Sequence, residues 1–395
     1  MNNVFRTAMI VALLLVASVT SSLAVCWGDL DNDRDADGSD VAKLIADFGR
    51  TDCATHPPCR GDIAPEGSPD DAVDRSDLTL FAADFGRDDC AFHAPLNLFS
   101  IGDSIGEGIT AYGDPDLAAH HETVWSTGYD SGDTVYSLNE RFADTDPTGF
   151  YANTEPRDGI FNHAVEGDEM LNFYDQAMAV VGAASAAPSG TVGMITVLLG
   201  NNDVCTDTVG TMTDLVDFED RYRAGLEALK NNDVTKNAYI HVSGIPAIYW
   251  LWIAKRSNLW CRLLAWPNVP CQELLANAGV NDCISDEMDP DTIDYDEDGP
   301  GPDQGDGPNC IRRKQFHAAI QDDYNRIIRD VLMEFRDDGR LPNAYYADIF
   351  DFQFESDHIN NFDCFHPSVR GHERMAEEQW CRSPWGADDQ ACASE

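Results

Sequence analysis

Three short apolar runs, each followed at once by a polar motif, constrain the fold of this chain more than any other feature. The runs are residues 96–101, 194–199 and 238–242, and stretches with helical periodicity lie between and after them. Strands that alternate with amphipathic helices are typical of a layered α/β domain with a parallel sheet. We therefore predict such a domain over residues 96–395.

The polar motifs lie where a sheet of this kind binds its ligands. Gly102-Asp103-Ser104 follows the first run, Gly200-Asn201-Asn202-Asp203 the second and Ser243-Gly244-Ile245-Pro246 the third. Open α/β sheets bind ligands beyond the carboxyl ends of their strands. Residues 96–395 contain two more polar motifs. Asn162 to Gly167 lies between the first and second runs, and Asp363-Cys364-Phe365-His366 lies after the third.

Four of these motifs, in this order, resemble the conserved blocks of the SGNH, or GDSL, hydrolase family. Ser100–Ser104 is similar to its first block, Asn162–Gly167 to its second, Gly200–Asp203 to its third and Asp363–His366 to its fifth. The resemblance spans about residues 96–385. It includes two flanking segments, Ile245–Tyr249 and His366-Pro367-Ser368, that are similar to phospholipase-B-like and actinobacterial secreted members. It implies a three-layer α/β/α fold with a flavodoxin-like parallel sheet, and hydrolysis of carboxylic esters.

The residue types in these blocks suit acyl transfer through a serine. A serine hydroxyl attacks well only when a base takes its proton, so the resemblance makes Ser104 the nucleophile and His366 the base. A carboxylate on the second ring nitrogen fixes the tautomer, which is the role implied for Asp363. The oxyanion donors implied are the Ser104 and Gly167 N–H groups and the Asn202 side chain. No metal or cofactor enters this chemistry.

Residues 25–92 form a separate module with an internal repeat. Cys26-Trp27-Gly28-Asp29 matches Cys59-Arg60-Gly61-Asp62, and residues 46–53 match residues 83–90. The first copy has the acidic spacing of an EF-hand calcium loop, which surrounds one Ca²⁺ with oxygen ligands. Its ligands are predicted to be the side chains of Asp29, Asp31, Asp33, Asp37 and Asp40 and the backbone carbonyl of Asp35.

The second copy is less regular. Asp62, Asp74 and Asp77 match three ligand positions, and Glu66, Asp70 or Asp71 could supply others. A helix with an apolar stripe is predicted after each loop, formed by Val41, Leu44, Ile45 and Phe48 and by Leu78, Phe81, Ala82 and Phe85.

Two loop–helix units of this kind resemble a dockerin domain. The resemblance implies a small α-helical domain with structural Ca²⁺ and a cohesin-type scaffold protein as partner. A role in stability or attachment alone is the alternative.

Residues 1–24 have the features of a secretory signal, with Arg6, an apolar run and the cleavage site Ser22-Leu23-Ala24. The apolar run is too short for a membrane span. The twelve cysteines contain no Cys-x-x-Cys pair, so export predicts disulfides and a secreted, extracellular or periplasmic protein. In the module, the disulfides Cys26–Cys53 and Cys59–Cys90 would each lie within one copy of the repeat. Disulfides between the two copies are equally compatible with the spacing.

The charge balance excludes some partners. The formal net charge of −44 repels nucleic acids and anionic membranes, so neither is expected to bind. The substrate remains open between lipid esters and acylated polysaccharides. The rival hypothesis is a dockerin-anchored binding or scaffold protein with an inert hydrolase fold, and the intact catalytic set argues against it.

A long insertion, residues 247–315, follows the third predicted strand. Its first part is rich in Trp, Tyr and Leu, which fits either core packing or a wall or lid that binds an acyl group. Residues 294–299 have the acidic spacing of the first half of a calcium-binding loop. The helix predicted for residues 318–335 carries one apolar stripe, as a helix packed against a core would. Cys205 and Cys364 lie beside two of the polar motifs, so disulfides there would hold the active-site loops.

Overall fold

The structure is a computed structural model, and it describes residues 24–30, 35–53, 59, 61–64, 72–88, 90–91, 94–129, 135–145, 150–154, 160–187, 190–283, 306–386, 389 and 392. Its internal contacts divide the chain into two units, residues 1–93 and residues 94–395. Residues 1–23 of the expected signal segment lie outside the described part. None of the helices in the described part is long and apolar enough to cross a membrane.

The larger unit is built on a parallel sheet of four strands in the order β3-β4-β5-β6. These are β3 (Leu98–Gly102), β4 (Met194–Leu198), β5 (Tyr239–Ser243) and β6 (Ala344–Ala347). The three strands predicted from the apolar runs are therefore confirmed, and β6 was not predicted. Ser100 also forms an isolated parallel β-bridge with Asn162, so the motif Asn162–Gly167 begins beside β3.

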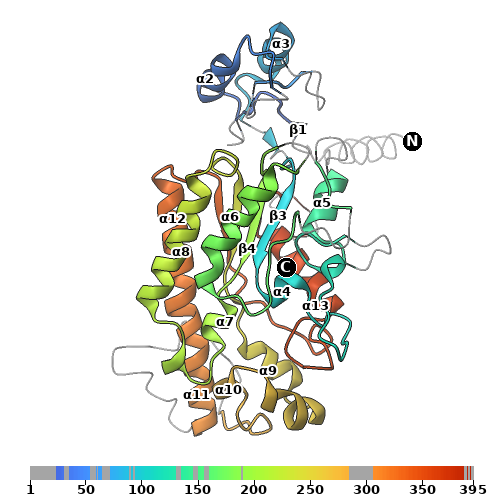
Figure 1. The fold of residues 1–395 in the computed structure, drawn as a ribbon, viewed down its shortest axis with the longest axis vertical. Coiled ribbons are helices and arrows are strands. Elements are labelled where there is room, and N and C mark those ends of the chain that lie inside the picture. The colour runs from blue at the N-terminus through green and yellow to red at the C-terminus, as the bar shows by residue number, and fades with distance from the viewer. Residues whose placement is uncertain are drawn as a thin grey trace, which may run out of the picture. The chain divides into compact units, whose positions relative to one another are not determined.

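Helices cover the sheet on both sides. In Figure 1, α6, α8 and α12 lie on one side of the sheet, and α5 and α13 lie on the other. The helical elements of the larger unit are α4 (Ser104–Glu107), η1 (His121–Thr123), α5 (Leu138–Thr145), η2 (Met170–Asn172), α6 (Phe173–Ala184), α7 (Asn201–Val204), η3 (Val209–Thr211), α8 (Leu215–Lys230), α9 (Tyr249–Lys255), η4 (Cys261–Ala265), η5 (Trp266–Asn268), α10 (Gln272–Leu275), α11 (Pro308–Ala318), η7 (Ala319–Asn325), α12 (Arg326–Asp337) and α13 (Val369–Cys381).

Packing between these elements explains the layers. α6 and α8 approach closely at Gly225, where a Cβ would lie 2.1 Å from the ring of Phe173. On the other side, the His241 side chain of β5 is hydrogen-bonded to Gln379 of α13 over 2.8 Å. A parallel sheet with helices on both faces confirms the predicted α/β class.

The long helix predicted for residues 318–335 is present but continues further at both ends. It runs from α11 through the π-helical η7 into α12, so it covers 308–337. Its predicted stripe is buried, as expected for a core-facing helix: Ile320, Tyr324, Ile327, Ile328, Val331 and Phe335.

The smaller unit shows its sequence repeat as structural symmetry. It contains α2 (Gly38–Asp47), α3 (Arg75–Asp84), and the short parallel strands β1 (Ala24–Val25) and β2 (Cys90–Ala91). The buried Asp40 accepts the N–H groups of Leu30 (2.7 Å) and Asp37 (2.8 Å). In the second copy, Asp77 accepts those of Ile63 and Asp74 in the same way, both over 2.7 Å.

The two copies also interlock through their backbones. Gly49, at the end of α2, donates to Val73 of the second copy over 2.8 Å. Gly86, at the end of α3, donates to Ala36 of the first copy over 2.7 Å. Each helix end is thus fixed by the other copy's loop, and neither copy is a closed unit.

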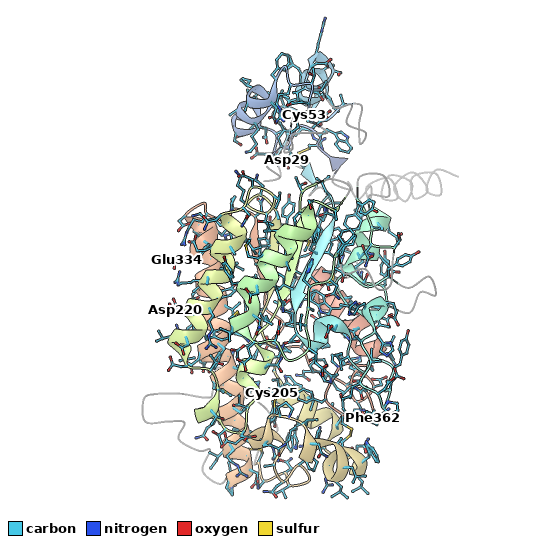
Figure 2. All side chains as sticks on the ribbon, in the orientation of Figure 1. Asp29, Cys53, Cys205, Asp220, Glu334 and Phe362 are labelled. Carbon is cyan, nitrogen blue, oxygen red and sulfur yellow. A yellow bond between two sulfur atoms is a disulfide. The ribbon has the colours of Figure 1, made fainter. Side chains whose placement is uncertain are left out.

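The two disulfides of the smaller unit also connect its two copies. The bonds are Cys26–Cys90 and Cys53–Cys59, so the pairing that staples each copy separately is wrong and a cross-pairing is present. The reason is that β1 pairs with β2, which brings the two ends of the module together. Figure 2 labels Cys53 and Asp29 in this unit.

The predicted apolar stripes of α2 and α3 are only partly buried. The core of the module is formed by Leu30, Leu44, Cys53, Val73 and Phe81. Ile45, Phe48, Leu78 and Phe85 are exposed, so at least half of each predicted stripe does not pack into the core. The core of so small a module takes one fully buried apolar residue from each stripe, Leu44 and Phe81.

Candidate active site

Three side chains from distant parts of the chain meet at the carboxyl end of the sheet. Ser104 begins α4 directly after β3, and its Oγ lies 2.9 Å from Nε2 of His366, 262 positions away. Nδ1 of His366 lies 2.6 Å from Oδ2 of Asp363. The structure therefore brings together a hydroxyl, an imidazole and a carboxylate in the order that nucleophilic catalysis requires.

Asp363 is surrounded by hydrogen-bond donors. Its Oδ2 accepts from Thr110 Oγ1 (3.0 Å), and its Oδ1 accepts from Asn360 Nδ2 (2.7 Å) and the Phe365 N–H (2.8 Å). Burial alone would raise the pKa of Asp363, but the hydrogen bond from His366 and those from the backbone hold this pKa below its ordinary value. The carboxylate is thus kept ionised and oriented toward the ring.

Asn360 and Thr110 were not predicted, and they build the support of this carboxylate. Asn360 Oδ1 accepts the N–H groups of Phe362 (2.9 Å) and Asp363 (3.0 Å), and its Nδ2 also donates to Thr110 (2.9 Å). Asn360 shapes the loop that carries both Asp363 and His366. No pattern in the sequence pointed to either residue.

Asp103 links the loops that follow β3 and β4. Its Oδ1 accepts the Ile105 N–H at the start of α4 (3.0 Å), and its Oδ2 accepts Nδ2 of Asn201 (2.8 Å). The side chain is fully buried, and this burial raises the pKa of Asp103 to about 6. The carboxylate therefore ties the turn of Ser104 to the motif that follows β4.

Asn202 lies in the same site. It lines a pocket together with Ser104 and His366. One N–H of its Nδ2 group donates to the Asp168 carbonyl over 2.9 Å, and an amide nitrogen carries a second N–H. Gly200, with φ of +110°, turns the chain from β4 into the short helix that carries Asn202.

Gly167 lies in the neighbouring loop, in a turn with φ of +79°. It is not one of the residues that line the pocket, unlike Ser104 and Asn202. The next residue, Asp168, holds Asn202 through its carbonyl. Among the predicted oxyanion donors, the structure thus brings Ser104 and Asn202 to the pocket and Gly167 to the adjoining turn.

Gln176 of α6, a residue that was not predicted, connects these loops. It accepts the N–H of Gly102 (2.9 Å) and donates to the carbonyl of the same residue (2.8 Å). Its amide also donates to the Asp168 carboxylate over 2.6 Å. The end of β3 and the loop that holds Asn202 are therefore fixed to one helix.

The pocket beside Ser104 is mainly apolar. It encloses about 510 Å³ of empty space, including its solvent-open mouth. None of the described residues that line it carries a carboxylate or an ammonium group. They are Ser104, Ile105, Asn201, Asn202, Cys205, Pro246, Ile248, Leu251, Phe354, Ile359, Phe365, His366 and Pro367.

The aromatic first part of the insertion combines both predicted roles. Tyr249, Trp252 and Trp266 are buried as core residues. Ile248 and Leu251 line the pocket, as an acyl-binding wall would.

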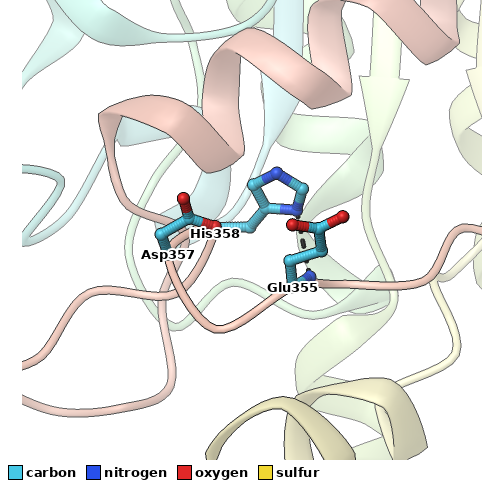
Figure 3. A group of neighbouring side chains, drawn as sticks. All are labelled: Glu355, Asp357 and His358. Carbon is cyan, nitrogen blue, oxygen red and sulfur yellow. Dashed lines mark hydrogen bonds between the residues drawn. The ribbon is translucent and has the colours of Figure 1, made fainter.

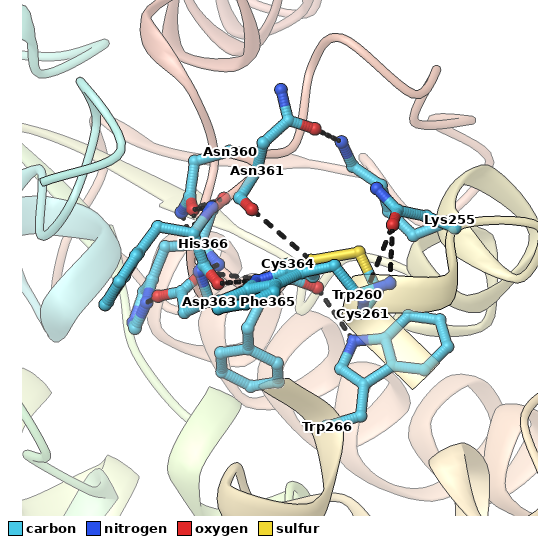
Figure 4. The surroundings of a disulfide bond; sticks show 12 residues. Lys255, Trp260, Cys261, Trp266, Asn360, Asn361, Asp363, Cys364, Phe365 and His366 are labelled. Atoms are coloured by element: carbon cyan, nitrogen blue, oxygen red, sulfur yellow. Dashed lines mark hydrogen bonds and ion pairs between the residues drawn. A yellow bond between two sulfur atoms is a disulfide. The ribbon is translucent and has the colours of Figure 1, made fainter. Parts of the chain in front are cut away.

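This segment is also bonded to the loop that carries Asp363 and His366 (Figure 4). A disulfide joins Cys261 to Cys364, and Trp266 Nε1 donates to the Cys364 carbonyl over 2.9 Å. Trp260 Nε1 donates to the Phe362 carbonyl (2.8 Å), and the buried Lys255 donates to Asn361 (2.7 Å).

The other loop of the site is held in the same way. The Cys205–Cys271 disulfide fixes the motif after β4 to the same segment. Figure 2 labels Cys205 and Phe362 near this end of the unit. The predicted disulfides at the two active-site loops are therefore present. Cys283–Cys310 and Cys381–Cys392 complete the pairing of the unit.

Glu355, Asp357 and His358 form a cluster that superficially resembles a metal site (Figure 3). Nδ1 of His358 already accepts the Glu355 N–H over 3.0 Å, and Asp357 forms an ion pair with Arg370. The cluster is therefore part of the local fold, and these three residues do not form a free set of ligands.

In the smaller unit, carboxylate oxygens of Asp35, Asp37 and Asp40 lie within 4.8 Å of one another. The Asp35 side chain thus joins the group, where only its backbone carbonyl was expected. Asp29 and Asp62 are buried. Asp31, Asp33, Glu66, Asp70, Asp71 and the half-loop at 294–299 lie outside the described residues.

The model of the GDSL-like lipase/acylhydrolase family matches residues 98–378. The chain belongs to this family. The matched range contains every residue of the site, and a GDSL-like domain indicates carboxylic ester hydrolase activity.

The other comparisons add little to this result. Comparison with the curated proteins gives no match. Twelve solved chains match. One of them is 13% identical with a TM-score of 0.37, covering 72% of this GDSL hydrolase and 94% of that chain. A likeness this low carries no conclusion.

Proposed function

We propose that this GDSL hydrolase is a secreted serine esterase that cleaves esters of apolar acyl groups, with lipid esters as its substrate class. The observation that carries the proposal is the Ser104–His366–Asp363 arrangement at the edge of an apolar pocket. The flank at residues 245–249, similar to phospholipase-B-like members, supports the same substrate class.

The geometry supports a two-step mechanism. Ser104 Oγ attacks the ester carbonyl carbon while His366 Nε2 takes the hydroxyl proton, and the protonated ring then delivers it to the leaving alcohol. Water attacks the resulting acyl-Ser104 with His366 again acting as the base. The acid product leaves, and Ser104 recovers its proton. Asp363 holds Nδ1–H, so that Nε2 presents its lone pair to the hydroxyl.

The oxyanion of each tetrahedral intermediate needs donors that are already in place. We assign this role to the N–H groups of Ser104 and Gly167 and to the second Nδ2 hydrogen of Asn202. The support for Asn202 is its place in the pocket and its hydrogen bond to Asp168, which orients the amide.

Replacing Asn202 with Ala should lower kcat by about 100-fold with little change in KM, because the lost hydrogen bond strengthens only as charge develops on the oxyanion. Steady-state kinetics with a soluble p-nitrophenyl ester would measure both constants. A variant with wild-type kcat and an unchanged thermal unfolding midpoint would remove Asn202 from the mechanism.

The apolar lining of the pocket predicts a preference for longer acyl groups. Each buried CH₂ contributes about 0.8 kcal/mol, so kcat/KM should rise about threefold to fourfold per methylene until the pocket is filled. A series from acetate to decanoate p-nitrophenyl esters would measure this, beside acetyl-xylan and a lysophospholipid. Strict preference for acetyl esters with cleavage of acetyl-xylan would favour acylated polysaccharides instead.

We further propose that the smaller unit is a dockerin-like domain that binds structural Ca²⁺. The clustered oxygens of Asp35, Asp37 and Asp40 support a site in the first copy, since Ca²⁺ prefers several carboxylate ligands around one point. The matching roles of Asp40 and Asp77 support a second site, with Asp62 and Asp74 among its ligands. A cohesin-type scaffold protein would be the partner of such a domain.

Calcium should stabilise this unit measurably. At free Ca²⁺ one hundred times above its Kd, the free energy of unfolding should rise by about 2.7 kcal/mol for each site. Titration calorimetry and thermal unfolding of the full chain, with and without chelator, would measure binding and stabilisation. Asp35→Asn should weaken the first site, whereas Asp52→Asn, outside the loops, should not. Absence of any heat or shift would contradict the proposal.

Secretion is the remaining part of the proposal. Six disulfides are formed, which require an oxidising compartment to persist. The signal-like residues 1–24 support export to the extracellular space or periplasm.

A further inference from the structure

Four large apolar side chains are exposed together on the segment that borders the active-site loop. Leu259, Trp260, Leu263 and Leu264 are exposed by 64%, 47%, 65% and 54%. We refer to these four residues as the leucine patch. Single exposed apolar residues are common on protein surfaces, whereas a contiguous group marks an interaction site.

The patch is one face of a short helical stretch. Its other face is buried through Cys261, Ala265 and Trp266, with Cys261 in the disulfide to Cys364. Residues four apart lie on the same side of a helix, so Leu259 lies beside Leu263 and Trp260 beside Leu264. Both faces of this stretch are thus apolar, although only one of them packs against the protein.

The sequence around the leucine patch is also unusual in its lack of acidic residues. The chain has 70 acidic residues, yet residues 234–272 contain no Asp or Glu. Arg256 and Arg262, the cationic neighbours of the patch, are partly exposed. A carboxylate loses its hydration when it is pressed against a lipid surface, so a segment without acidic residues can approach such a surface at lower cost.

The segment that carries the patch also contributes to the substrate pocket. Leu251, from the same segment, lines the pocket. Trp260 donates to the carbonyl of Phe362, three residues before Phe365, which also lines the pocket. A Trp ring with an apolar body and a bonded N–H is typical of side chains that lie at a boundary between lipid and water.

We propose that the leucine patch docks the enzyme on the surface of a neutral or zwitterionic lipid aggregate. The side chains of Leu259, Leu263 and Leu264 enter the acyl region, and Trp260 lies at its boundary with the headgroups. The nearby pocket then receives a lipid ester directly from the aggregate. The choice of a lipid surface rests on the proposed lipid esterase function, but docking itself requires no catalysis.

The test uses the full chain with Ser104 replaced by Ala, so that the lipid is not consumed. Phosphatidylcholine vesicles are the probe, and co-sedimentation measures the partition coefficient. Adding Leu259→Ser, Leu263→Ser and Leu264→Ser should lower this coefficient about a hundredfold, because membrane binding of an amphipathic surface scales with the apolar area that it buries. The matched control carries Ile45→Ser, Leu78→Ser and Val216→Ser, which remove equally exposed aliphatic side chains elsewhere.

The outcomes separate docking from catalysis. With Ser104 intact, the triple patch variant should cleave a soluble short-chain p-nitrophenyl ester at the wild-type rate and should lose activity only on the vesicles. Failure of the Ser104→Ala chain to sediment with vesicles would overturn the docking proposal while leaving the esterase function standing. Equal losses in the control variant would overturn it too. A dimer in sedimentation velocity that the patch variant dissociates would show that a second copy covers the patch instead.

Discussion

Replacing Ser104 with Ala lowers kcat for a p-nitrophenyl ester by at least about 10⁴-fold, because no other group near His366 can form the acyl intermediate. The Oγ of Ser104 is the atom that is hydrogen-bonded to His366. Ala keeps the helical backbone of α4 and leaves the capping of Ile105 by Asp103 in place. We therefore expect an unchanged thermal unfolding midpoint.

The controls for Ser104→Ala test whether Ser104 and His366 act as one catalytic unit. His366→Ala should cost about as much as Ser104→Ala, and the double variant should cost little more, since residues that act as one unit are not additive. A fluorophosphonate probe should label the wild-type protein and fail to label Ser104→Ala. Retention of full activity by Ser104→Ala would refute both the nucleophile and the proposed mechanism. Labelling of the wild type argues against an inert hydrolase fold.

Asp363→Asn should lower kcat by about 10⁴-fold through a different cause, the wrong tautomer of His366. Oδ2 of Asp363 accepts from the ring of His366 and the hydroxyl of Thr110, and Oδ1 accepts from Asn360 and from backbone N–H groups. The NH₂ group of an amide must therefore face one of these two sets of donors. If the NH₂ group faces His366, Nδ1 must accept, and the ring proton moves to Nε2, where it blocks proton transfer from Ser104.

The matched control for this variant is Asp357→Asn. Asp357 is an exposed acid on the same segment, paired with Arg370 rather than with His366. Its replacement should change kcat by less than about twofold, since exposed ion pairs contribute little. A spectroscopic readout adds to the kinetics: the His366 Nδ1 proton resonance should be present in the wild type and absent in Asp363→Asn. Equal rates for the Asp363→Asn variant and the wild type would show that His366 needs no carboxylate.

The N-terminal module shows what a repeat in the sequence can and cannot specify. The spacing of its acids predicted two related loops, the second less regular than the first, and Asp40 and Asp77 do occupy equivalent places. The disulfide pairing was not predictable, because the spacing of the four cysteines is compatible with pairing within each copy and with pairing between the copies. β1 and β2 decide it, since their pairing brings Cys26 and Cys90 together.

The catalytic domain likewise has features that the sequence predicts and features that it does not. The three apolar runs were sufficient to predict the parallel sheet, and the resemblance of the motifs to the SGNH blocks was sufficient to select Ser104, Asn202, Asp363 and His366, because both depend on residue type and order along the chain. The supports of these residues could not be predicted. Asn360, Thr110 and Gln176 act through distance and direction, and ordinary polar residues of this kind carry no local pattern.

The sequence by itself determined the fold class and, through the family resemblance of its motifs, the hydrolase chemistry and the proposed reacting groups, since strand periodicity and motif residues are local properties. Only the tertiary structure decided how those groups are held and which surface adjoins them. The aromatic insertion illustrates this division. Its composition was equally compatible with core packing and an acyl-binding wall, and the folded chain uses Trp252 and Trp266 for the core and Leu251 for the pocket. Burial depends on which segments meet in space, and that information is not local.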